Sequence, residues 1–189
     1  MSKLVKNLRS AIQLCGLEDG MTVSFHHNLR SGDTIAGEIM GAIAELGVKD
    51  LTIAPSSLLP GHDALIPYME DGTITGIQTS GVSPQIGRLI QQKDLLKQPV
   101  EMRTHGSRSA AFAEGKLHVD IAFIAASHAD KYGNCNSFEG ASAFGSMGYS
   151  MVDAAYADKV VVITDNLSHT PVYPVSIDQK PRCRKPEQT

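Results

Sequence analysis

The chain has 189 residues, of which 42% are hydrophobic and 20% charged, and its formal net charge is −3 at pH 7. A chain of this size can bury the core of one domain, and its weakly acidic balance argues against a nucleic acid or an anionic membrane as a partner. No apolar run approaches the ~20 residues that span a bilayer, and the first nine residues lack the apolar core of a signal peptide.

Three cysteines, Cys15, Cys135 and Cys183, are too few and too scattered for a disulfide framework. Their number is odd, and no Cys-x-x-Cys pair is present, which also argues against a cysteine-based zinc site. We therefore expect a cytoplasmic protein with reduced thiols and no metal cofactor.

Hydrophobic periodicity predicts helices and strands in alternation over the first 126 residues. In chain order these are a helix at 5–14, a strand at 21–25, a helix at 33–46, a strand at 51–54, a helix at 62–70, a strand at 74–79, a helix that begins at Pro84, a strand at 100–103, a helix at 109–114 and a strand at 119–126. Such alternation predicts an α/β fold, with an open, mostly parallel sheet that carries helices on both faces.

The pattern changes after residue 126. Residues 127–149 are rich in glycine and small polar side chains, which predicts a long loop of the kind that often carries function. One helical turn is expected at 152–157 and a final strand at 160–164. Residues 180–189 show no periodicity and hold four basic residues and two prolines, which predicts a disordered tail after one α/β domain at 1–179.

Several predicted strands end in turns built from Ser, Thr, His and Gly. These turns lie at residues 26–27, 56–57, 79–81, 104–106 and 127–128. Because parallel strands end at the same edge of a sheet, the turns should meet at one rim, where α/β domains bind ligands. The alternative is that the turns are polar only because βα turns in general are.

The turn after the first strand is the richest in functional groups. It carries His26, His27, Asn28, Arg30 and Gly32. Asp33, which follows, is expected to cap the next helix rather than to act in catalysis. The planar fork of Arg30 suits a carboxylate, and the alternative is a solvated surface arginine.

The His26–His27 pair allows three interpretations. As metal ligands, the two imidazoles would need further ligands such as His105 or His128. They are otherwise proton-transfer groups or donors to an anion, or a packed pair with a structural role. Common catalytic motifs are absent from the sequence. The chain has no G-x-G-x-x-G after a strand, no P-loop, no H-E-x-x-H and no G-x-S-x-G.

An ordered set of segments nevertheless resembles the α subunit of citrate lyase, its citrate CoA-transferase component. The segments are 20–33 (GMTVSFHHNLRSGD), 49–54 (KDLTIA) with 56–58 (SSL), 79–81 (TSG), 105–108 (HGSR), 115–123 (GKLHVDIAF), 132–136 (YGNCN), 145–149 (GSMGY) and 152–154 (VDA), followed by the strand at 160–164. Each is weak alone, but their order and spacing hold from about residue 4 to 179.

The resemblance implies the α/β domain of CoA-transferases and sugar-phosphate isomerases. It also implies a reaction, the exchange of acetyl for citrate on a thiol of an acyl carrier protein, which gives acetate and a citryl thioester. The CoA-type thioester is a substrate on the partner, and no cofactor is bound covalently. The implied partners are the β subunit and the acyl carrier protein (γ) subunit, in an oligomeric complex.

The residues expected to bind substrate lie on the predicted rim. They are His26, His27, Asn28, Arg30, Gly32, Ser80, Gly81, His105 and Arg108. No catalytic residue is assigned, because the resemblance implies a mixed anhydride that forms directly between the substrates. Family members have two related domains with the active site between them, so we expect this chain to be a partial copy that ends after the first.

Two other functions stay open at this stage. The chain is alternatively a non-catalytic protein that keeps a citrate or CoA site, or a protein similar to sugar-phosphate isomerases. The lack of a clear pairing of Glu or Asp with Lys on the rim argues against the isomerase. The choice between citrate and citramalate as the acid also stays open.

Overall fold

A computed structural model describes residues 2–26 and 33–172 of the chain. The helices are α1 (Leu8–Cys15), α2 (Ile35–Glu45), the 3-10 helix η2 (Pro60–Leu65), α3 (Ile66–Glu70), α4 (Pro84–Gln92), α5 (His105–Ala113) and α6 (Ser150–Tyr156). The strands are β1 (Thr22–Ser24), β2 (Leu51–Ile53), β3 (Ile74–Thr79), β4 (Glu101–Met102), β5 (Ile121–Ala125), β6 (His128–Asp130), β7 (Cys135–Asn136), β8 (Lys159–Ile163) and β9 (Leu167–Ser168).

The chain divides into two compact units. The first, which we call the sheet unit, comprises Val5–Ile124 and Tyr149–Val161. The second, the hairpin unit, comprises residues 2–4, 125–148 and 162–172 among those that the structure describes. No helix in the described part of the chain is long and apolar enough to cross a membrane.

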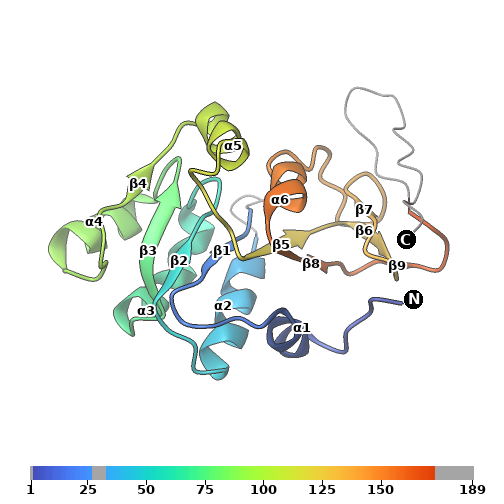
Figure 1. The fold of residues 1–189 in the computed structure, drawn as a ribbon, viewed down its shortest axis with the longest axis horizontal. Helices are drawn as coiled ribbons and strands as arrows, with labels where there is room; N and C mark the ends of the chain where they lie inside the picture. The colour runs from blue at the N-terminus through green and yellow to red at the C-terminus, as the bar shows by residue number, and fades with distance from the viewer. Residues whose placement is uncertain (1, 27–32, 173–189) are drawn as a thin grey trace. The chain divides into compact units, whose positions relative to one another are not determined.

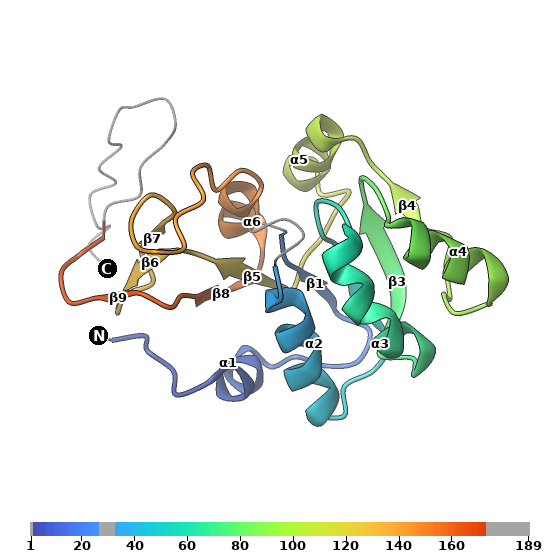
Figure 2. The same ribbon diagram turned by 180° about the vertical axis from the view of Figure 1, so that it is seen from behind.

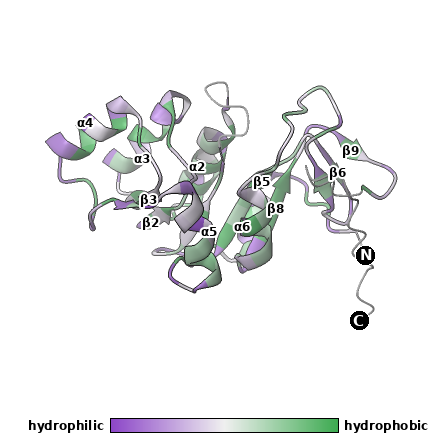
Figure 3. Cartoon of the chain, turned by 90° about the horizontal axis from the view of Figure 1, so that it is seen from above, coloured by the Kyte–Doolittle hydropathy of each residue, from purple (hydrophilic) through white to green (hydrophobic). Residues whose placement is uncertain are grey.

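The main sheet has six strands in the order β4-β3-β2-β1-β5-β8 (Figure 1). Each of the pairs β1–β2, β1–β5, β2–β3 and β3–β4 is parallel. Within the sheet unit, α2, α3 and α4 lie on one face of the strands and α5 and α6 on the other (Figure 3). Figure 2 shows the α2 and α3 face in front of the strands. The predicted α/β fold with a parallel sheet and helices on both faces is confirmed.

The strands form the core because their side chains are apolar on both faces. Val23 of β1, Ile53 of β2 and Ile74 of β3 have no exposed surface, and Figure 3 shows β5 as a hydrophobic segment. On the α5 side, Phe112 packs in a cluster with Ala122, and Val152 of α6 covers the cluster. Continuous apolar strands of this kind are typical of a sheet covered on both faces.

Helix ends follow the chemistry of the sequence. Gly16 ends α1 with φ of 70°, a left-handed conformation that favours glycine. Ser83 caps α4 by accepting from the backbone N–H of Ile86, and proline follows it at the helix start. The Oδ1 atom of Asp33 accepts from the N–H of Ile35, the first residue of α2, at 3.0 Å. The N-cap position itself is Thr34, whose side chain makes no capping hydrogen bond, so Asp33 lies one residue before the cap that was predicted for it.

Two predicted helices differ from those in the structure. The predicted helix 62–70 is two pieces, η2 and α3, because Pro67 has no N–H to continue the hydrogen-bond ladder. The predicted helix 109–114 begins earlier, at His105, because the Thr104 hydroxyl accepts from the N–H of Ser107 at 3.2 Å. His105 therefore opens a helix rather than lying in a turn.

The glycine-rich segment 127–149 is not one long loop. It contains β6 and β7, which pair antiparallel and form a second sheet with β9 in the order β7-β6-β9. The prediction missed β9, which is only two residues long and follows the strand that was predicted to be last. A short hairpin with a glycine at its turn is hard to see in such a polar stretch.

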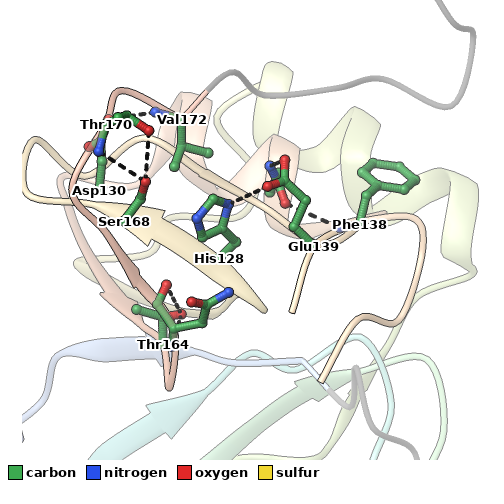
Figure 4. Close-up of polar contacts among 10 residues, drawn as sticks. His128, Asp130, Phe138, Glu139, Thr164, Ser168, Thr170 and Val172 are labelled. Carbon is green, nitrogen blue, oxygen red and sulfur yellow. Dashed lines mark hydrogen bonds and ion pairs between the residues drawn. The ribbon is translucent and has the colours of Figure 1, made fainter. Parts of the chain in front are cut away.

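Asp130 is the most connected side chain described in the hairpin unit, and Figure 4 shows it beside Val172. Its carboxylate accepts from the backbone N–H groups of Tyr132, Asn134 and Val172 and from the Asn134 side chain, at 2.8–3.1 Å. Burial opposes ionisation, but these donors lower the pKa of Asp130 below its usual value. Burial also raises the pKa of the neighbouring Cys135 to about 11, so its thiol is protonated and unreactive at neutral pH.

Gly76 in β3 is required by the close approach of β2. A Cβ atom at this position would lie 2.4 Å from the Thr52 hydroxyl, 3.3 Å from its methyl group and 3.2 Å from its Cβ. Rotation of the Thr52 side chain moves the hydroxyl but leaves the close contact with the Cβ. We expect Gly76→Ala to lower the free energy of unfolding by about 1–3 kcal/mol. Chemical denaturation followed by circular dichroism measures this, since the chain has no tryptophan.

The matched control is Gly37→Ala in α2, where the new Cβ would meet only the Ala64 Cβ at 3.8 Å. Alanine favours a helix interior over glycine by roughly 1 kcal/mol, so this variant should be slightly more stable than the wild type. Equal effects of the two substitutions would contradict the role assigned to Gly76.

Candidate functional site

The end of β1 provides the first two side chains of the site. Ser24 is the last residue of β1, and His26 lies two residues beyond it. Both are buried, and the His26 side chain is only 4% exposed. A buried imidazole and a buried hydroxyl need polar partners, because an unpaired polar group in the core is costly.

Asp153 of α6 is that partner. Its carboxylate has no exposed surface and accepts from the Ser24 hydroxyl at 2.5 Å and from His26 Nε2 at 2.9 Å. Arg108 of α5 donates to the same carboxylate through both terminal nitrogens, at 2.6 and 3.1 Å. We call these four side chains the Asp153 network.

Arg108 links this network to a second strand. One terminal nitrogen also donates to the carbonyl of Ala54, just after β2, at 2.8 Å. Its guanidinium lies over the rings of Phe112 and Tyr149, 5.0 and 5.8 Å from their centroids. A planar, always charged fork suits both contacts, which a lysine would not reproduce.

The charge of Asp153 is stabilised by its donors. Burial alone would raise the pKa of this carboxyl, but the hydrogen bonds and charges of His26 and Arg108 hold its pKa far below the usual range. Asp153 is therefore ionised at every physiological pH. The pair of Asp153 and Arg108 is neutral as a whole, so the charge of the network depends on His26.

His26 keeps one ring nitrogen without a described partner. Nε2 faces Asp153, whereas Nδ1 is buried and accepts or donates no hydrogen bond to any described residue. The Tyr149 ring lies 6.0 Å from the His26 ring, and the His105 ring lies 5.3 Å from the Tyr149 ring. His26 thus keeps one buried ring nitrogen that no described residue engages.

A second polar group lies at the neighbouring strand ends. The Ser80 hydroxyl, after β3, bonds to the Ser57 hydroxyl at 2.7 Å and to the Ser56 carbonyl. The carbonyl of Gly81 accepts from the N–H of Leu58 at 2.8 Å. The turns after β2 and β3 are therefore tied together at the carboxyl edge of the sheet.

The predicted site residues divide into three groups. His26 and Arg108 meet on one carboxylate, with His105 nearby through Tyr149, while Ser80 and Gly81 belong to the second group of contacts. The predicted residues His27, Asn28, Arg30 and Gly32 lie outside the described residues. Whether any of these side chains binds substrate stays a prediction.

Sequence reasoning missed Asp153 and Ser24 as members of the site. A signal was present, because Asp153 is a charged residue between Val152 and Ala154 on a short helix whose neighbours are apolar. A carboxylate on the buried side of a helix implies a buried cation or several donors. Its strand partner Ser24 carries no comparable signal.

One set of described side chains has the composition of a metal site. His118, Asp120 and Asp158 offer ligand atoms within 4.8 Å of one another. His118 Nε2 lies 3.3 Å from a carboxylate oxygen of each aspartate. His118 and Asp158 are exposed, however, and ion pairs with the imidazole explain the arrangement without a metal.

Comparisons with known proteins identify the family. The family described as "Citrate lyase, alpha subunit" matches residues 1–182. The chain belongs to the citrate lyase α-subunit family. The resemblance found in the sequence is therefore confirmed.

Known relatives agree with this assignment. The citrate lyase alpha chains of Haemophilus influenzae and Escherichia coli are 43% and 42% identical to it over 177 residues, which is 94% of this chain. These residues are only 35% and 34% of the relatives, so the chain spans about a third of their length.

Solved structures give the same result. The chain is similar to the putative α subunit of citrate lyase of Streptococcus mutans, which was solved in complex with citrate. The TM-score is 0.88 at 41% identity over 93% of this chain and 34% of that one. An acyl-CoA transferase of E. coli O157:H7 shares the fold, with a TM-score of 0.56 at 14% identity.

Replacing Arg108 tests the buried network. Arg108→Lys keeps the charge but loses the double hydrogen bond to Asp153 and the contact with Ala54. We expect the free energy of unfolding to fall by about 3 kcal/mol, as for other broken buried ion pairs. The control is Arg9→Lys, in an exposed pair with Glu45, which should change the free energy of unfolding by less than about 0.5 kcal/mol. Equal losses of stability in the two variants would contradict the role of Arg108 in a buried network.

The ionisation of Asp153 also predicts a pH dependence. Its pKa is lowered in the folded chain, so its contribution to stability is complete above about pH 5 and is lost as the pH falls below about 4, where the unfolded carboxyl takes up a proton. The stability difference between the wild type and Asp153→Asn should therefore shrink between pH 6 and pH 3. A constant difference in acid denaturation series would contradict this sign.

Proposed function

We propose that this chain provides one wall of a citrate CoA-transferase site. In the proposed reaction, citrate replaces acetyl on the thiol of an acyl carrier protein, and the products are acetate and a citryl thioester. The family assignment and the citrate complex of the S. mutans relative support this substrate class. The remaining parts of the site and the partner subunits belong to the same proposal.

The chemistry sets requirements that can be compared with the site. A citrate carboxylate oxygen attacks the acetyl thioester carbonyl, and the thiolate leaves as a mixed anhydride forms. The thiolate then attacks the citryl carbonyl of the anhydride, and acetate leaves. Both additions create an oxyanion that needs hydrogen-bond donors, and citrate with its three carboxylates needs positive charge or oriented N–H groups.

The observation that carries the proposal is the buried Asp153 network with the unpartnered His26 Nδ1 at the carboxyl edge of the sheet. This edge is where open α/β sheets bind ligands. Arg108 is engaged by Asp153 and the Ala54 carbonyl, so we assign it a positioning role. His26, His105 and the turns at Ser80 and Gly81 are the proposed wall, and Arg30 is the proposed cation for a carboxylate.

Calorimetry with citrate and an acetate-release assay test the proposal together. We expect the chain to bind citrate but to release little acetate from acetyl-acyl carrier protein by itself. Co-production with the part of the E. coli relative beyond the matched region should restore acetate release. His26→Ala should reduce the restored rate by at least tenfold, on the order of one lost charge-assisted hydrogen bond.

His118→Ala is the matched control, because His118 is exposed, lies in the same unit and is not part of the network. It should keep the restored rate. Citrate binding without restored transfer would favour the non-catalytic alternative, and a chain that neither binds citrate nor restores transfer would contradict the proposal.

A further inference from the structure

The placement of Asp153 decides which nitrogen of His26 carries the proton. An ionised carboxylate has no hydrogen to donate, so the contact of 2.9 Å between Asp153 and Nε2 requires an N–H on Nε2. A neutral His26 therefore has its lone pair on Nδ1. The partner of a histidine nitrogen fixes the tautomer in this way in many sites.

An unprotonated Nδ1 has no hydrogen to donate to an anion. It repels a carboxylate, whereas an N–H on the same atom would donate a charge-assisted hydrogen bond. His26 thus becomes complementary to a carboxylate only after Nδ1 takes up a proton. The new positive charge is not cancelled by the network, because Asp153 and Arg108 already neutralise each other.

The groups that face His26 favour this response. Asp153 from α6 is ionised, Arg108 from α5 is paired with it, and Tyr149 lies beside the ring. Burial raises the pKa of the Tyr149 hydroxyl, so that group carries no charge at neutral pH. Among the described residues, the only carboxylate that contacts His26 is that of Asp153, which Arg108 also shares, so we assign the ligand as the counter-charge at Nδ1.

We propose that Asp153 is a positioning residue that keeps the His26 proton on Nε2, so that binding of a substrate carboxylate is coupled to uptake of one proton at Nδ1. The proposal rests on the proposed function for its choice of citrate as the ligand. It adds a mechanism for recognition: the site gains its positive charge only when the acid arrives. The proton comes from solvent, and the imidazolium and carboxylate charges then balance.

Nitrogen NMR of the wild-type chain tests the positioning directly, without citrate. The two ring nitrogens of a neutral histidine give distinct signals, and the His26→Gln variant assigns those of His26 among the seven histidines. In the neutral ring of His26 we expect a protonated Nε2 and an unprotonated Nδ1. A proton on Nδ1 would overturn the proposal whether or not citrate binds.

Calorimetry tests the coupling. In two buffers with different ionisation enthalpies, citrate binding to the chain with neutral His26 should be accompanied by uptake of a proton, and the affinity for citrate should fall as the pH rises. His118→Gln should keep both effects as the matched control, since it removes an exposed histidine. Binding with no uptake would overturn the coupling, while absence of binding would overturn the proposed function and the coupling with it.

The Asp153→Asn variant distinguishes a positioning role of Asp153 toward His26 from a purely structural role. Its amide oxygen would still accept from Arg108, and its NH2 group would face Nε2, which moves the neutral His26 proton to Nδ1. Citrate binding should then lose its proton uptake and its pH dependence, while the NMR signals report the other tautomer. Unchanged proton uptake on citrate binding by this variant would overturn the positioning role of Asp153. If the variant does not fold, the NMR and calorimetry experiments on the wild-type chain still test the proposal.

Discussion

A single buried carboxylate constrains the carboxyl edge of the sheet. Asp153 lies on the last helix of the sheet unit, and its partners come from β1 and α5, with a further link to the end of β2. A charge with no exposed surface is tolerated only where donors surround it. The spacing of these elements is therefore fixed by hydrogen-bond distances as well as by apolar packing, and the position of His26 follows from both.

These contacts fix one side of the proposed site. Ser24 is the last residue of β1, whose core residue Val23 is fully buried, and His26 follows two residues later. The Arg108 guanidinium is held by Asp153 and by the Ala54 carbonyl, and it lies over the rings of Phe112 and Tyr149. Such a wall can hold an imidazole in one orientation before a ligand arrives, which is the main requirement for recognition of a charged acid.

Much of the fold was predictable because local rules and tertiary packing agree. The strand at 74–79 and the helix start at Pro84 were predicted correctly. The apolar residues of the strand and the Ser83-Pro84 pair at the helix start each favour one local structure. The helix at His105 was placed too late because its start depends on a Thr104–Ser107 hydrogen bond that has no apolar signature. The hairpin at 128–136 was missed because backbone contacts to Asp130 stabilise it, and the hydrophobic pattern does not reveal them.

The site was only partly predictable for a related reason. His26 and Arg108 were identified from the polar turns and the family resemblance, but nothing in the sequence pairs residue 26 with residue 153. That contact joins segments 127 residues apart, and only the fold brings them together. The family assignment supports the proposed substrate class, while the proposed tautomer of His26 rests on the contact with Asp153.

A crystal structure of the chain with citrate bound tests the proposed role of His26 most directly. We expect a citrate carboxylate oxygen within hydrogen-bond distance of His26 Nδ1, with Asp153 still bound to Nε2 and to Arg108. Citrate bound elsewhere on the sheet unit, or a protein group that occupies Nδ1 while citrate is bound, would contradict it.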